Sequence, residues 1–199
     1  MNDRKAMRPR TGRSAAAAPL AAALLAAGCA APDAGMASPG LDAGAAFARM
    51  KTLAGEYDAT ATGMEGTTRV SYEITSGGHA LLERLNDGGD EEMASIYYLE
   101  GADLALVHYC SAGNRPHMRL DRAASTIDDL RFEWDGTATD IDPSKDGHIH
   151  RARFRFPREG AVETDWEFWQ DGKPAHAMTF VLERAPAASA AATGATPVK

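Results

Sequence analysis

From residue 56 to residue 184 apolar and polar side chains alternate, and glycines interrupt the alternation mostly every 11 to 13 residues. A period of two is typical of β-strands with one buried face, and Gly beside Asp, Glu or Asn is typical of tight turns. The pattern predicts ten short strands, over 57–61, 68–75, 79–85, 93–99, 104–110, 117–121, 130–134, 148–156, 162–169 and 175–183.

The links between these strands are too short for crossover helices, so we expect an all-β, antiparallel, up-and-down barrel. One short helix precedes it. Asp42 is a good N-cap, Phe47, Met50 and Leu53 form an apolar stripe, and Gly55 ends the segment.

The alternation also predicts which side chains face inward. In 68–75 the apolar set is Val70, Tyr72 and Ile74. In 148–156 one face carries aromatic and small residues while the other carries three arginines, which we assign to solvent. The inward sets expected in two further strands are Leu104, Leu106, His108 and Cys110, and His148, His150, Ala152, Phe154 and Phe156.

The N-terminal segment has a different character. Residues 1–28 place five basic residues before an apolar run that ends in small residues and Cys29. This layout is that of a secretory signal and resembles a bacterial lipoprotein signal, which implies acylation of Cys29. The run is too short for a membrane span, which needs roughly 20 residues. We expect a flexible tether over 29–41, the barrel domain over 42–184, and a disordered tail over 185–199.

Removal of the leader changes the charge. The leader holds five basic residues and one acid, so the 21 basic and 28 acidic residues of the chain become 16 and 27, a formal charge of −11. Such an acidic domain lacks the basic footprint that nucleic acid requires. We expect an exported protein, held on the periplasmic face of the outer membrane by lipid on Cys29. Cys110 is then an unpaired thiol.

A short helix, the segment 53–57 (Leu-Ala-Gly-Glu-Tyr) and an antiparallel meander resemble the calycins, the lipocalins and their relatives. Gly55 and Tyr57 occupy the positions of the Gly-x-Trp signature of that group, with Tyr in place of Trp. The resemblance implies that Arg184 packs across the ring of Tyr57, and that the barrel can hold a small, mostly apolar ligand. The haem-binding nitrobindin-like barrels are a second resemblance, but their Gly-rich motif is absent after Tyr57.

If the barrel is incompletely filled, its inward side chains form the binding site. Aromatic residues supply the walls and tyrosines the polar tips, whereas in a filled barrel the same residues are core. The candidate ligand-binding residues are Tyr72, Tyr97, His108, Cys110, Trp134, His148, His150, Trp166 and Phe168.

Three chemical alternatives remain open. His148 and His150, two apart on a strand, share a face and would form an enzyme or metal site if His108 converged on them. Cys110 with His108 is a candidate thiol nucleophile. The loop 135–147 carries four aspartates but does not match the EF-hand spacing, and is a candidate lid at the barrel mouth.

The sequence therefore predicts an envelope protein that binds a small apolar or amphipathic molecule inside a β-barrel, without assigning a catalytic residue, a cofactor or a metal. A small histidine-dependent enzyme is the first alternative. A scaffold that docks another protein is the second, and predicts an exposed apolar patch without a cavity. The oligomeric state is left open.

Overall fold

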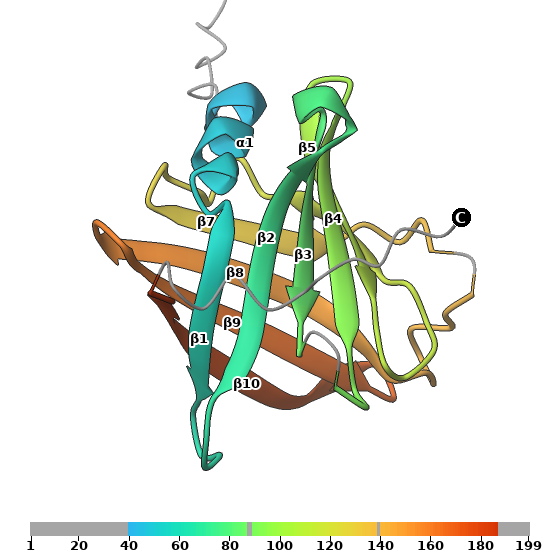
Figure 1. Cartoon of the computed structure of the whole chain (residues 1–199). Helices are drawn as coiled ribbons and strands as arrows, with labels where there is room; N and C mark the ends of the chain where they lie inside the picture. The colour runs from blue at the N-terminus through green and yellow to red at the C-terminus, as the bar shows by residue number, and fades with distance from the viewer. Residues whose placement is uncertain (1–39, 87–88, 139, 187–199) are drawn as a thin grey trace, which may run out of the picture. The chain divides into compact units, whose positions relative to one another are not determined.

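The computed structural model describes residues 40–86, 89–138 and 140–186. Ten antiparallel strands form a closed barrel in which each strand pairs with its neighbours in sequence and β1 pairs with β10 (Figure 1). This confirms the predicted up-and-down barrel with one short helix. The elements are α1 (Ala43–Lys51), β1 (Gly55–Ala61), β2 (Thr68–Thr75), η1 (Ser76–Gly78), β3 (Ala80–Leu85), β4 (Met93–Glu100), β5 (Asp103–Tyr109), β6 (His117–Leu120), β7 (Asp129–Trp134), β8 (His148–Arg158), β9 (Ala161–Gln170) and β10 (Lys173–Arg184).

Helix α1 lies at one end of the barrel (Figure 1). It begins as the sequence predicts, with the Asp42 carboxylate accepting a hydrogen bond from the Ala45 amide at 2.8 Å. Arg49 forms an ion pair with Asp128, and Lys51 donates to the Gly78 carbonyl, so the helix is tied to the loops at that end. We call this end of the barrel the helix end and the opposite end the mouth.

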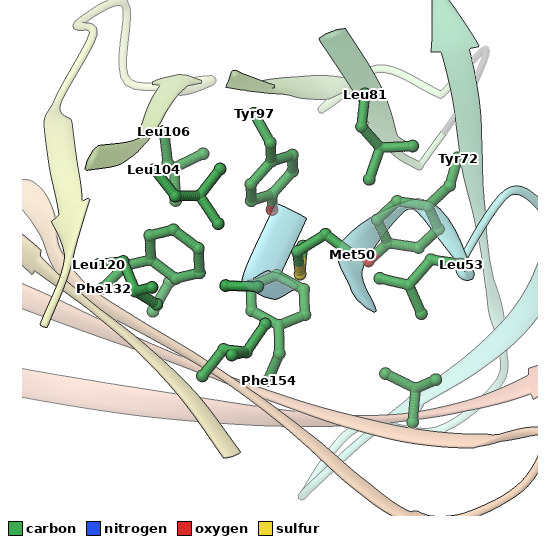
Figure 2. Packing of buried hydrophobic residues seen from close by; sticks show 14 of the residues in the cluster. Met50, Leu53, Tyr72, Leu81, Tyr97, Leu104, Leu106, Leu120, Phe132 and Phe154 are labelled. Atoms are coloured by element: carbon green, nitrogen blue, oxygen red, sulfur yellow. The ribbon is translucent and has the colours of Figure 1, made fainter. Parts of the chain in front are cut away.

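The core fills the barrel next to α1. Met50 and Leu53 enter it from the helix segment and lie among aromatic and aliphatic side chains of the strands (Figure 2). Tyr97, Phe132 and Phe154 meet edge to face, with ring centroids 5.7 to 6.0 Å apart. The helix end of the barrel is therefore closed by packed side chains.

The barrel seam contains the contact that the calycin resemblance implies. The guanidinium of Arg184 lies 4.9 Å from the centre of the Tyr57 ring and donates to the Tyr57 hydroxyl at 2.8 Å. It also donates to the carbonyls of Thr52 and Ala54. Gly55 has φ +139°, a backbone conformation that residues with a side chain rarely adopt, and a Cβ there would contact Arg184 Nη1.

One residue predicted to face inward is exposed, and one predicted strand ends a residue earlier. Ile74 is 45% exposed rather than inward, because β2 ends there beside the Ser76–Gly78 turn, beyond the packed core. Cys110 lies just past the end of β5 and is half-buried. The three arginines of β8 do face outward, where they pair with acidic side chains of neighbouring strands.

Four predicted features lie outside the described residues: the leader over 1–28, the acylated Cys29, residues 29–39 of the tether and residues 187–199 of the tail. Within the described part of the chain, no helix has the length and apolar character needed to cross a membrane.

Candidate functional site

A cavity of about 290 Å³ opens at the mouth of the barrel. Its walls come from the ends of β3, β5 and β9 and from the starts of β4, β8 and β10. The lining is mostly apolar, with two imidazoles, a carboxylate, a hydroxyl and a thiol among aromatic and methionine side chains: Leu85, Glu91, Met93, His108, Cys110, Ser111, Ala112, Ile149, Trp166, Phe168, His176, Met178 and Phe180.

A second lobe of about 260 Å³ adjoins the first, since five residues line both. The shared residues are Leu85, Glu91, Met93, Met178 and Phe180. The second lobe extends under the β1–β2 loop, where Met64 and Glu65 line it. Each lobe is near the small end of the range typical of small-molecule sites, roughly 300–1,000 Å³.

His108 is the polar residue at the inner side of this cavity. Its side chain is 3% exposed, lies 5.1 Å from Trp166 between ring centroids, and lines the cavity wall. Burial lowers the pKa of His108 to about 4, so the imidazole is neutral at pH 7. Its Nε2 atom is buried and has no hydrogen-bond partner among the described residues. An unpaired buried nitrogen is costly, and a polar ligand atom would satisfy it.

Behind His108 lies a buried carboxylate, Glu83 on β3, which is 4% exposed. The hydroxyls of Tyr72 and Tyr97 each donate to one of its oxygens at 2.6 Å. Burial raises the pKa of Glu83, and the hydrogen bonds from the two tyrosines and Ser95 act in the opposite direction. Three donated hydrogen bonds are what an ionised carboxylate in a protein interior needs.

Ser95 connects the two groups. Its hydroxyl lies 3.0 Å from His108 Nδ1 and also hydrogen-bonds to Glu83. A serine has one hydroxyl proton, and a carboxylate only accepts, so that proton goes to Glu83 and Nδ1–H of His108 donates to the Ser95 oxygen. This assigns the proton of the neutral ring to Nδ1. Nε2 is therefore an acceptor, and it points away from Ser95.

The predicted site residues divide into three groups. Four of them line the cavity: His108, Cys110, Trp166 and Phe168. Tyr72 and Tyr97 do not line it, because both are buried in the core with their hydroxyls engaged by Glu83. The remaining three, Trp134, His148 and His150, lie together outside the cavity.

The face assigned to His148 and His150 needs correction. A register shift between Ile149 and Arg151 interrupts the pairing of β8 with β9. Ile149 pairs with Phe168, which lines the cavity, whereas His148 pairs with Trp169, which lies on the opposite face. The bulge thus puts the two histidines on the other face of β8 from the cavity.

On that face the two imidazoles form a closed aromatic cluster. His148 Nδ1–H donates to the Asp146 carbonyl at 2.9 Å, which leaves His148 Nε2 to accept from His150 Nδ1–H at 3.0 Å. The His150 ring stacks on Trp169 at 3.7 Å, and Trp134 contacts both histidines. Burial and the neighbouring His148 lower the pKa of His150 to about 4.

His108 therefore does not converge with His148 and His150, because the wall of the barrel separates them. In the described residues, no group of three or more His, Cys, Asp or Glu side chains is placed to hold a metal ion. The aspartates of the 135–147 loop have protein partners: Asp135 and Asp142 accept from their own loop, Asp146 accepts from the Asp142 amide, and Asp140 pairs with Arg115.

Sequence reasoning missed Glu83 and Ser95. The available signal was the spacing along each strand. Glu83 lies two positions from both Leu81 and Leu85, and Ser95 lies two positions from both Met93 and Tyr97. A carboxylate at the centre of an inward-facing set requires buried donors, and inward-facing tyrosines two strands apart can supply them.

No protein-family model matches this sequence, and a search of curated proteins gives no significant match.

Proposed function

We propose that this protein is a lipid-anchored envelope protein that binds a small apolar or amphipathic molecule in the mouth of its barrel. The observation that carries the proposal is His108 Nε2, a buried acceptor without a partner in the described part of the chain, on a residue that lines a mostly apolar cavity. Apolar walls with a few fixed polar groups are typical of small-molecule sites.

The core and the cavity divide the barrel into two parts. The helix end is packed and closed, while the mouth has two adjoining lobes. A ligand would place its apolar body against Trp166, Phe168 and the two methionines, and its polar head against His108. The closed barrel and the Tyr57–Arg184 contact support the calycin resemblance, which implies the same use of the interior.

The envelope location is supported by the charge and apolar pattern of residues 1–28 and by Cys29. The first described residues, Gly40 and Leu41, lie at the helix end, where Leu41 exchanges hydrogen bonds with Arg122.

The scaffold alternative has less support. It predicts a continuous exposed apolar patch, but the exposed large apolar side chains of the described residues belong to different loops and strands. They are Met64, Ile74, Leu99, Tyr109, Ile127 and Val181.

Binding of 1-octanol to the full chain carrying Cys29→Ser, which prevents acylation, tests the proposal by calorimetry. Loss of one hydrogen bond of 0.5–1.5 kcal/mol in His108→Phe should weaken binding by about 2- to 12-fold. Met178→Trp, which fills the space shared by both lobes, should abolish it. Tyr109→Phe, a neighbour on the exposed side of the same strand, is the matched control and should bind like the parent chain. Equal binding by all four chains would contradict the proposal.

A further inference from the structure

Two carboxylates line the mouth, beside the imidazole of His176 and the hydroxyl of Ser111. Glu91 lines both lobes and Glu65 lines the second. Among the described residues, neither lobe is lined by a lysine or an arginine. An anionic head group therefore meets no lysine or arginine in the described lining, and it approaches two carboxylates.

The inner side of the cavity also favours a ligand group that donates a hydrogen bond over an anion. His108 presents an acceptor rather than a donor, because Nδ1 holds the ring proton and donates it to Ser95. Glu83, linked to His108 through Ser95, is a buried carboxyl group behind the imidazole. A carboxylate or phosphate oxygen facing Nε2 would meet a lone pair with no hydrogen between them.

From these contacts we infer that the site selects amphiphiles whose head group carries an N–H or O–H donor and no negative charge, and rejects fatty-acid anions. This inference rests on the proposed function and specifies its ligand class. An alcohol donates to His108 Nε2 and leaves the rim carboxylates solvated. A protonated amine donates to the same atom and is also attracted by Glu91 and Glu65, so amines bind best.

The buried Nε2 of His108, which has no partner among the described residues, separates this arrangement from an ordinary acidic surface, since His108 is 3% exposed and lines the cavity. The carboxylates at the rim then influence which molecules reach His108 Nε2, because they repel anions and attract cations. Charge at the rim affects association and selectivity more than it affects the affinity of a neutral ligand.

The test uses three probes with the same eight-carbon chain: octylamine, 1-octanol and octanoate, at pH 7.5 and low salt. At this pH the amine is protonated and the acid is ionised. Calorimetry on the full Cys29→Ser chain should rank octylamine first, 1-octanol second and octanoate at least about tenfold weaker than octylamine, because octanoate lacks the donor and is repelled.

Glu91→Gln should then narrow the ratio of octylamine to octanoate affinity by about two- to fivefold. Glu159→Gln removes an equal charge from the β8–β9 turn at the helix end and should leave the ratio unchanged. Octanoate binding as tight as that of octylamine, or a ratio insensitive to Glu91→Gln, would overturn the inference while leaving the proposed function intact. Failure of all three probes to bind would overturn the proposed function itself.

Discussion

The imidazole of His108 and the hydroxyl of Ser95 lie 3.0 Å apart in the interior of the barrel, between a buried carboxylate and an apolar cavity. With the Ser95 proton donated to Glu83, this contact places the ring proton of His108 on Nδ1 and leaves Nε2 as an acceptor without a partner among the described residues. The polar network therefore has two roles, since it satisfies Glu83 in the core and orients one acceptor at the cavity.

The first prediction concerns Glu83. In Glu83→Gln one amide group replaces an acceptor oxygen, so one of the three donors around the carboxylate loses its partner. We expect a loss of about 1–3 kcal/mol in the free energy of unfolding, measured by urea denaturation. Glu83→Leu should cost more, because Tyr72 and Tyr97 both keep buried hydroxyls without an acceptor.

Adding Tyr72→Phe and Tyr97→Phe to Glu83→Leu provides the control, because the triple variant has no tyrosine hydroxyl left without an acceptor at this position. It should regain part of the stability lost by Glu83→Leu alone. Wild-type stability of Glu83→Gln would show that the network does not hold an ionised carboxylate.

The second prediction is a pH dependence of stability. The pKa of His108 is about 4 in the folded protein and about 6.5 when unfolded, so between these values the unfolded chain binds more protons. Stability from His108 is complete above pH 6.5 and is lost as the pH falls toward 4, by about 3 kcal/mol. The measurement is the free energy of unfolding from pH 7 to pH 4.

His108→Gln isolates this effect, because it keeps a polar side chain without a titrating group. Glu83, whose pKa is raised by burial, acts in the opposite direction in both chains and cancels in the difference. The stability difference between wild type and His108→Gln should fall on acidification. A difference that stays constant with pH would show that His108 is not buried in its neutral form.

The third prediction concerns Gly55 at the barrel seam. Gly55→Ala introduces a Cβ 2.3 Å from Arg184 Nη1 at φ +139°, and should destabilise the protein by at least about 1 kcal/mol. Gly63→Ala is the matched control, with φ +81° but no atom within 4 Å of the new Cβ. The destabilisation by Gly63→Ala measures the effect of a positive φ without a clash. Melting temperatures lowered by similar amounts in the two variants would argue against a clash with Arg184.

The architecture could be predicted from the sequence because alternation and glycine turns are local signals. Ten strands were expected and ten are found, with ends displaced by a few residues; β10 begins at Lys173 rather than at residue 175. The Tyr57–Arg184 contact followed from a family resemblance, since no local pattern pairs two residues 127 positions apart.

The site was less predictable. His148 and His150 share a face as expected, but a single bulge at Ile149 moves them outside the cavity, and nothing in residues 148–151 indicates where the extra residue is inserted. Glu83 depends on donors from β2 and β4, so its partners are visible only once the strands are paired.

The fourth prediction uses Cys110, which lines the cavity and is half-buried. In the full chain with Cys29→Ser it is the only thiol, so a maleimide reports on this position alone. Octylamine at saturating concentration should slow the labelling rate, because the ligand occupies the space beside the sulfur. An unchanged rate at saturation would place the bound amine elsewhere on the protein.

The most direct measurement is the nitrogen-15 spectrum of the six imidazoles while the full Cys29→Ser chain is titrated with 1-octanol. In the free protein His108 should be neutral at pH 7 with its proton on Nδ1. On binding, the largest change among all the ring nitrogens should occur at His108 Nε2 as it accepts the hydroxyl proton, with Nδ1 still bonded to Ser95. Saturable binding that leaves His108 Nε2 unchanged, or a free protein with the proton on Nε2, would contradict the assignment of this atom as the ligand acceptor.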